Sequence, residues 1–149
     1  MSSATRRRAG FTLIEILVVI TVIAILAGLV SPMVFQHVGD AKETAVRAQF
    51  ETFDLALDAY RLDSDVYPST AQGLDALVTM PTGPNQPRRW RGPYLKRAVP
   101  LDPWGRPYRF ESPGTVNPNG YDLSSYGREG QPGGTGEDAD LRAWEAPPR

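Results

Sequence analysis

Apolar residues form one long run near the N-terminus of the chain. Residues 11–30 read FTLIEILVVITVIAILAGLV and are apolar except for two threonines and Glu15. A helix of this length is about 30 Å long, which matches the hydrocarbon core of a bilayer. The run therefore predicts a membrane-spanning helix, to which we assign residues 11–31.

A second pattern follows between residues 34 and 62. Apolar side chains recur there at alternating steps of four and three residues, which places them on one face of a helix. We expect this face to pack against a sheet. The five positions are Val46, Phe50, Phe53, Leu57 and Tyr60.

Two features are expected to disturb this helical stretch. Pro32 removes a backbone hydrogen bond, so we expect a kink there. Asp40 and Glu43 have the spacing of a capping box, which indicates a loosening or restart of the helix near Gly39. One turn further on, Arg47 and Glu51 have the spacing of an ion pair.

The rest of the chain is rich in loops. Residues 69–72 (STAQ) form another capping-box pattern and predict a short helix through Val78, followed by a proline-rich loop over 80–93. Alternating residues around 108–110 and 121–125 predict two or three short antiparallel strands. The expected fold class is α+β: a long N-terminal helix packed on a small antiparallel sheet, with a loop-rich C-terminal region.

Charge gives the apolar run a direction. Arg6, Arg7 and Arg8 precede it, and the first ten residues contain no acid. The positive-inside rule then predicts a cytoplasmic N-terminus, a single pass through the membrane, and a C-terminal domain on the far side of it.

Two simpler explanations of the N-terminus fit less well. A cleaved secretory signal peptide needs small residues at positions −3 and −1 before the cut, and for a cut after Ala27 these would be Ile25 and Ala27, a poor match. An ordinary signal anchor accounts for the apolar run but not for Glu15. A carboxylate at mid-bilayer costs on the order of 2.5–3.5 kcal/mol, so Glu15 indicates a function.

Composition excludes several classes of protein. The chain has 16 Lys and Arg and 17 Asp and Glu; removing residues 1–10 leaves 13 basic and 17 acidic residues, a net charge of −4. This balance argues against a nucleic-acid partner, and the arginines of residues 88–91 are interpreted as a solvated or subunit-contact loop. There is no cysteine to form a disulfide, and no pattern typical of a catalytic site is present.

Acidic residues gather in a glycine-rich stretch near the C-terminus. Glu129, Glu137, Asp138 and Asp140 lie within twelve residues of one another. Calcium takes six to eight oxygen ligands in flexible geometry, so this stretch is a candidate calcium site, although it lacks the spacing of an EF-hand. The alternative is a solvated acidic loop.

The N-terminal residues also resemble a known processing signal. The sequence RRRAG-FTLIE is similar to the prepilin peptidase signature of type IV pilins and pseudopilins. This resemblance implies cleavage between Gly10 and Phe11 and N-methylation of Phe11. In a filament, Glu15 would pair with the Phe11 amine of a neighbouring subunit, because a buried carboxylate is tolerated when it is paired.

Three further segments resemble the major pseudopilins of type II secretion systems. They are YPSTAQGLDALV (67–78), YLKRAVPLDPWGRPY (94–108) and YDLSSYGREGQPGGTGEDADLRAW (121–144). The resemblance implies a type IV pilin-like fold, with a cleaved leader at 1–10, a transmembrane and polymerisation helix at 11–31, and a periplasmic domain at 32–149. It also implies a non-enzymatic subunit of a pseudopilus that drives export of folded proteins across the outer membrane.

The same resemblance implies partners and a metal. The partners would be further copies of the chain, minor pseudopilins, an inner-membrane assembly platform, prepilin peptidase and membrane lipid. Structural calcium would be held by side chains of Glu129, Asp138 and Asp140 and by backbone carbonyls near Tyr126 and Gln131. The sequence departs from the family here, since GREG stands in place of GADG.

Two alternative functions stay open at this point. One is a type IV pilin or competence pseudopilin, which belongs to the same structural class. The other is a membrane-anchored periplasmic binding module that never polymerises. Glu15 distinguishes them, because a monomeric anchor has no use for an acid within its membrane helix.

Overall fold

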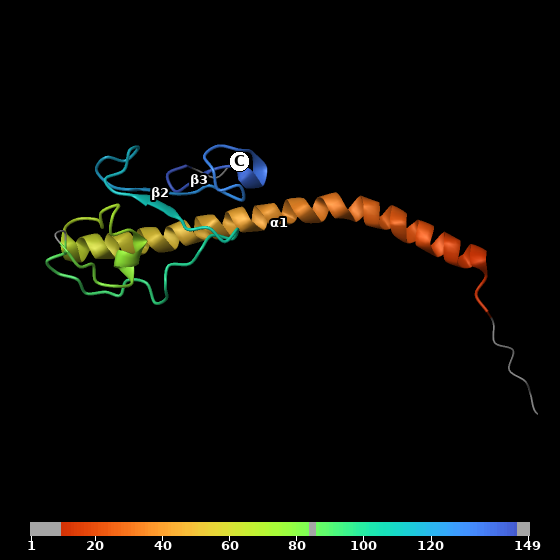
Figure 1. Cartoon of the computed structure of the whole chain (residues 1–149), viewed down its shortest axis with the longest axis horizontal. Helices are drawn as coiled ribbons and strands as arrows, with labels where there is room; N and C mark the ends of the chain where they lie inside the picture. Colours follow the sequence, from red (N-terminus) through yellow and green to blue (C-terminus); the bar gives the residue numbers. More distant parts are fainter. Residues whose placement is uncertain (1–9, 84–85, 146–149) are drawn as a thin grey trace, which may run out of the picture. The chain divides into compact units, whose positions relative to one another are not determined.

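The structure, a computed structural model, describes residues 10–83 and 86–145, without the side chains of residues 29–37. The chain divides into two compact units, Met1–Val38 and Gly39–Arg149. Along the chain the elements are helix α1 (Leu13–Ser64), 3₁₀ helix η1 (Leu74–Leu77), strands β1 (Arg109–Glu111) and β2 (Asp122–Ser125), 3₁₀ helix η2 (Gly136–Asp138) and strand β3 (Leu141–Arg142) (Figure 1).

Helix α1 is continuous, so the expected restart near Gly39–Asp40 is wrong. Gly39 has a different role: a Cβ built on it would lie 3.1 Å from the side chain of Glu137, so the glycine gives this side chain room. The backbone is also helical at Pro32, whose side chain lies outside the described set. The predicted kink there stays a prediction.

The expected Arg47–Glu51 pair is replaced by a pair on the other side of Arg47. Its guanidinium lies 2.8 Å from Glu43, one turn towards the N-terminus. An acid that precedes its basic partner by four residues complements the helix dipole, whereas the reverse order opposes it. Arg47 also donates to the carbonyl of Glu145, which ties α1 to the last described residue.

The predicted apolar face of α1 forms the centre of the core. All five of its residues are at most 3% exposed. They pack with apolar residues from η1 and from the sheet, and partly buried aromatic residues surround them. The face is formed by Val46, Phe50, Phe53, Leu57 and Tyr60.

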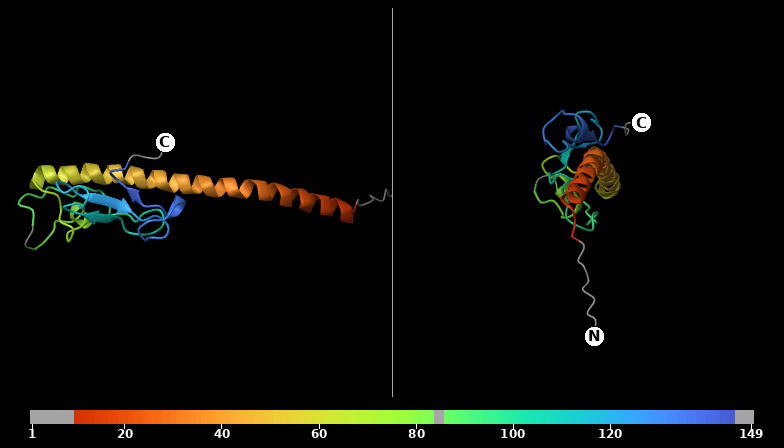
Figure 2. Two further views of the ribbon diagram at one scale, coloured as in Figure 1. Left: turned by 90° about the horizontal axis from the view of Figure 1, so that it is seen from above. Right: turned by 90° about the vertical axis from the view of Figure 1, so that its right-hand side faces the viewer.

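Three short strands form an antiparallel sheet in the order β1-β2-β3. Leu123 of β2 is fully buried and pairs with Phe110 of β1, whereas β3 pairs with the other end of β2 through Ser124 and Ser125. Within the second unit the sheet lies along one side of α1 (Figure 2). Tyr108, just before β1, makes edge contacts with the rings of Phe50 and Phe53.

The capping box at residues 69–72 is formed. The backbone N–H of Gln72 donates to the hydroxyl of Ser69, and the backbone N–H of Ser69 donates to the side-chain oxygen of Gln72. The helix that follows is only the four-residue 3₁₀ turn Leu74–Leu77. Its buried leucines add to the core next to α1.

Within residues 10–83 and 86–145, no helix is both long enough and apolar enough to cross a membrane.

Candidate functional site

The predicted processing site lies at the first described residues. Gly10 is exposed, and a Cβ built on it would meet no atom within 4 Å. Phe11 is 79% exposed. The fold of the described residues therefore does not require a glycine here, so any requirement for Gly10 comes from an external partner. Residues 1–9 of the predicted leader (1–10) lie outside the described residues.

Glu15 belongs to the first turn of α1. Its backbone N–H donates to the hydroxyl of Thr12 at 3.3 Å and to the carbonyl of Thr12 at 3.1 Å. Thr12 and Glu15 thus have the spacing and half of the bonding of a capping box. Sequence analysis missed this local role, although the pattern Thr-x-x-Glu is visible in the sequence. Glu15 consequently has two possible uses, in capping its own helix and in assembly.

The apolar run presents an uncovered surface. Its described large side chains are roughly half or more exposed, from 48% at Val19 to 86% at Leu13. Apolar surface of this extent on one element marks an interaction site for protein or lipid. The side chains are those of Phe11, Leu13, Ile14, Ile16, Leu17, Val18, Val19, Ile20, Val22, Ile23, Ile25 and Leu26.

The predicted calcium ligands lie in the loop between β2 and β3. Asp138, in η2, is bound by Arg128, whose Nε and Nη2 donate to the two carboxylate oxygens at 3.0 and 2.8 Å. This pairing lowers the pKa of Asp138 below its usual value. Asp140 accepts from the backbone N–H of Gly133 at 3.0 Å and from Arg142 at 3.2 Å.

The other predicted ligands do not complete a metal site. The Glu129 side chain and Gln131 are exposed, and the carbonyl of Tyr126 accepts the N–H of Gly130 at 3.1 Å. Among the described residues, no group of three or more His, Cys, Asp or Glu is placed to hold a metal ion. The oxygen chemistry suits calcium, but this arrangement does not, because arginines bind Asp138 and Asp140.

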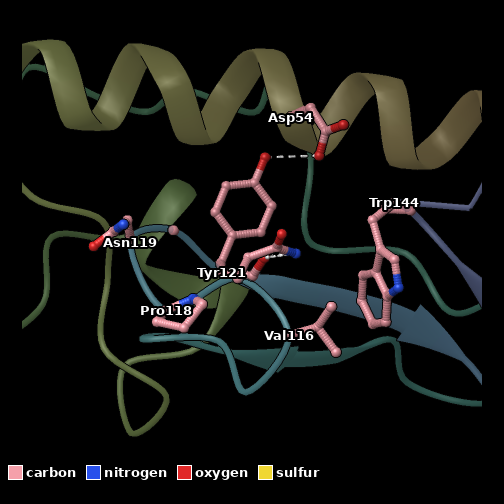
Figure 3. A pocket seen from close by; sticks show the side chains of 9 residues that line it. Asp54, Val116, Pro118, Asn119, Tyr121 and Trp144 are labelled. Carbon is pink, nitrogen blue, oxygen red and sulfur yellow. Dashed lines mark hydrogen bonds between the residues drawn. The ribbon is translucent and has the colours of Figure 1, made fainter.

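A surface pocket of about 490 Å³ lies between α1 and the turn before β2 (Figure 3). The hydroxyl of Tyr121 points to α1 and donates to Asp54 at 2.8 Å. Burial raises the pKa of Asp54, and burial together with the Asp54 carboxylate raises the pKa of Tyr121. None of the described residues that line the pocket is Ser, Cys, His or Lys, and the Tyr121–Asp54 contact ties α1 to the segment that leads into the sheet.

The basic cluster at residues 88–91 is part of a folded loop. Arg88 and Arg89 are exposed, whereas Trp90 donates from its indole nitrogen to the carbonyl of Ala76 at 3.0 Å. Arg91 lies 3.8 Å from Asp63 near the end of α1. The carbonyl of Arg89 also accepts a 3.5 Å hydrogen bond from the hydroxyl of Ser64, so the loop packs on the domain.

These features define a class of protein. A long N-terminal helix with an exposed apolar start, preceded by a Gly–Phe junction and packed further on against a small antiparallel sheet, is the architecture of type IV pilin-like proteins. Comparison with known families identifies the particular one. Residues 33–144 match the family "Type II secretion system (T2SS), protein G", and residues 5–31 match the prokaryotic N-terminal methylation motif. The chain belongs to the type II secretion system protein G family.

Individual relatives agree with this assignment. The chain is 48% identical over 141 residues to the type II secretion system core protein G of Pseudomonas aeruginosa, covering 94% of the chain and 97% of that protein. It is 43% identical over 140 residues to that of Vibrio cholerae, with 93% of each chain covered. The crystal structure of the major pseudopilin of enterohaemorrhagic Escherichia coli matches with a TM-score of 0.60 and 39% identity, over 70% of this chain and 88% of that one.

These comparisons confirm the resemblance seen in the sequence and the predicted α+β, pilin-like fold. They also agree with the expectation of a structural subunit that is not an enzyme. The leader boundary, the roles of Gly10, Phe11 and Glu15, and calcium binding stay predictions.

Proposed function

We propose that the protein is the major subunit of a pseudopilus and polymerises through its N-terminal helix to drive export of folded proteins across the outer membrane. The observation that carries this proposal is the exposed apolar surface of α1 between Leu13 and Leu26, which Phe11 extends just before the helix. Burying apolar surface is favourable by roughly 25 cal/mol per Å², so this helix gains free energy by packing against copies of itself or against lipid.

Processing precedes assembly in this proposal. Prepilin peptidase removes residues 1–10 by cutting between Gly10 and Phe11, and the new amine of Phe11 is methylated. The match of residues 5–31 to the methylation motif supports this step. So do the exposure of both residues and the open space around Gly10, since a peptidase needs access to the bond.

Glu15 then sets the position of each subunit in the filament. Cleavage turns the backbone nitrogen of Phe11 from a neutral amide into a charged amine, about 6 Å from Glu15 along a helix axis. Among packed apolar helices an unpaired carboxylate is costly, whereas a carboxylate bound to a neighbour's amine is tolerated. Pairing between subunits therefore favours one axial offset.

The location and partners follow from the same scheme. Before assembly the helix anchors the protein in the inner membrane, with Arg6, Arg7 and Arg8 on the cytoplasmic side and the domain of residues 32–149 in the periplasm. An inner-membrane platform and minor pseudopilins would take up the subunit from the lipid. The acidic balance of the chain after the leader supports this protein and lipid setting rather than a nucleic-acid one.

Complementation tests this function. The gene for the bacterium's own major pseudopilin is deleted, this chain is expressed in its place, and a type II cargo is measured in the culture medium. Secretion should return, and crosslinking should show a ladder of multimers. Surface pili without secretion would indicate a type IV pilin instead. A membrane-bound monomer that restores neither would indicate a binding module.

A further inference from the structure

The loop between β2 and β3 contains its own positive charge. One guanidinium, that of Arg128, faces two acids: it binds both carboxylate oxygens of Asp138 and lies 3.8 Å from Glu137. A guanidinium presents a planar fork of donors that matches a carboxylate in this two-point geometry. The contact joins the beginning of the loop to η2, ten residues later in the chain.

The backbone on either side of Arg128 is held in the same place. The N–H of Arg128 donates to the carbonyl of Glu137 at 2.8 Å. Its own carbonyl accepts two hydrogen bonds from the Arg106 guanidinium, at 3.2 and 3.0 Å. Arg106 lies between the turn of residues 102–105 and β1, so the position of Arg128 is fixed by segments far apart in the sequence.

The two sides of the loop also approach each other closely. Gly127 has a φ of 59°, and a Cβ built on it would lie 2.5 Å from the carbonyl oxygen of Glu137. Only a glycine allows this approach in this conformation. The acids of η2 are thereby brought next to Arg128 by the backbone as well as by the ion pair.

Acids held this close need a counter-charge. Asp140 has one in Arg142 and also accepts a hydrogen bond from the N–H of Gly133, whereas Asp138 and Glu137 share the charge of Arg128. A divalent ion bound by Asp138 would first have to displace the Arg128 fork, and would then lie next to a guanidinium of like charge. The GADG pattern of the pseudopilins that the chain resembles has alanine at this position, so such a conflict does not arise there.

We propose that Arg128 is a built-in counter-cation that closes the C-terminal loop, so that the loop of this chain folds without a divalent metal ion. The guanidinium neutralises the acids of the loop, a role that the resemblance to the major pseudopilins assigns to a calcium ion. It follows that the calcium site expected from the sequence is replaced in this chain by an internal ion pair. This inference is independent of the proposed function, since it concerns the fold of a single subunit and not its polymerisation.

Thermal unfolding of the full-length protein in detergent micelles tests the proposal. Melting temperatures are measured by circular dichroism in millimolar calcium, in millimolar magnesium and in excess chelator, and calcium binding is measured by calorimetry. The parent protein should melt within about 1 °C under all three conditions, because a ligand raises stability only when it binds the folded state. Its calorimetric titration with calcium should show no saturable binding.

The variant Arg128→Ala restores the alanine of the GADG pattern. Its melting temperature in chelator should fall by about 2–4 °C, a modest change because the Arg128 side chain is 61% exposed. Calcium should recover this loss, since the acids are then free to bind a cation. The matched control Arg97→Ala changes an exposed arginine outside the loop and should alter neither value.

Three results would overturn the proposal. The first is stoichiometric calcium binding by the parent protein, with a rise in melting temperature that chelator reverses. The second is an Arg128→Ala variant as stable in chelator as the parent. The third is a destabilised variant that calcium fails to rescue, since Arg128 would then not be standing in for a cation. If the variant does not fold, the melting temperatures and the calcium titration of the parent protein are sufficient to test the proposal.

Discussion

The hydroxyl of Ser125 donates a 2.6 Å hydrogen bond to Asp102, and both side chains are buried. The other carboxylate oxygen of Asp102 accepts the backbone N–H groups of Trp104 and Arg106, at 3.1 and 2.8 Å. The hydroxyl of Ser125 in turn accepts the N–H of Gly127 at 3.3 Å. One buried carboxylate thus links the turn of residues 102–105 to strand β2 and to the start of the acidic loop.

Removing the hydroxyl should destabilise the domain measurably. Ser125→Ala leaves one oxygen of a buried carboxylate without its donor, which costs roughly 1.5–3 kcal/mol for a hydrogen bond to a charged group. Urea unfolding of the full-length protein in micelles measures the free energy of unfolding. Ser124→Ala, at the neighbouring position of β2, is the matched control, because no side-chain hydrogen bond of Ser124 is found within the described residues. Equal losses in the two variants would contradict the importance of this contact.

Asp122 gives the domain a predictable sensitivity to acid. Its carboxylate accepts the backbone N–H groups of Val116 and Asn117, at 2.7 and 3.0 Å, and the side-chain amide of Asn117 at 2.9 Å. Burial raises the pKa of Asp122, but these hydrogen bonds outweigh burial and leave the pKa below its ordinary value of 3.8. The folded state therefore binds the proton less readily than the unfolded chain does.

The sign of the pH dependence follows from this difference. The contribution of Asp122 to stability is present above pH 3.8 and is lost as the pH falls through its lowered folded-state pKa. Asn117→Ala removes the side-chain hydrogen bond to Asp122, so the folded-state pKa of Asp122 should rise. The contribution of Asp122 to stability should then be lost at a higher pH than in the parent. Melting curves over an acid titration measure this. Asn119→Ala, an exposed position in the same turn, should follow the parent; a shared profile for all three proteins would contradict the assignment.

Periodicity predicted the core well because its cause is local. Residues three and four apart share one face of a helix whatever the rest of the chain does, so Val46, Phe50 and Phe53 could be assigned to the core from spacing alone. Capping boxes were less certain. The capping box at Ser69–Gln72 forms, whereas the one at Asp40–Glu43 does not interrupt α1. Extending an existing helix adds one backbone hydrogen bond per residue, which is more favourable than ending the helix and nucleating a new one.

The contacts of the acidic loop could not be read from the sequence because they depend on tertiary structure. Arg128 meets Asp138 only after the chain has turned through the glycines between them, and Arg106 reaches the loop from a different turn. The spacing of Glu129, Asp138 and Asp140 indicated that these carboxylates need a nearby positive charge. Whether a metal ion or an arginine supplies this charge depends on where the arginines lie in the folded domain.

Cleavage of the leader should depend on the side chain at residue 10. Gly10→Leu places a bulky group where the protein has only open space, so folding of the described residues should be unaffected. The peptidase should fail to cut this variant, which would remain in the membrane as the full-length form. Intact-mass spectrometry of the purified protein distinguishes the two forms, and the parent should begin at a methylated Phe11. Maturation of the variant to the parent's mass would contradict the assignment of this site.

The two possible uses of Glu15 can be separated by mutation. Glu15→Gln retains a side chain suited to a capping box but has no charge, whereas Thr12→Ala removes the hydroxyl that accepts the N–H of Glu15 and keeps the carboxylate. If pairing with a neighbour's Phe11 amine drives assembly, Glu15→Gln should abolish filaments and secretion. Thr12→Ala should lose only the cap, worth about 0.5–2 kcal/mol, and should still assemble.

Both variants should insert into the membrane as well as the parent does, since neither adds a charge to the apolar run. Membrane fractionation, crosslinking and cargo secretion in cells without another copy of the gene measure the three steps separately. Normal secretion by Glu15→Gln together with a defect in Thr12→Ala would show that Glu15 serves its own helix and not the filament.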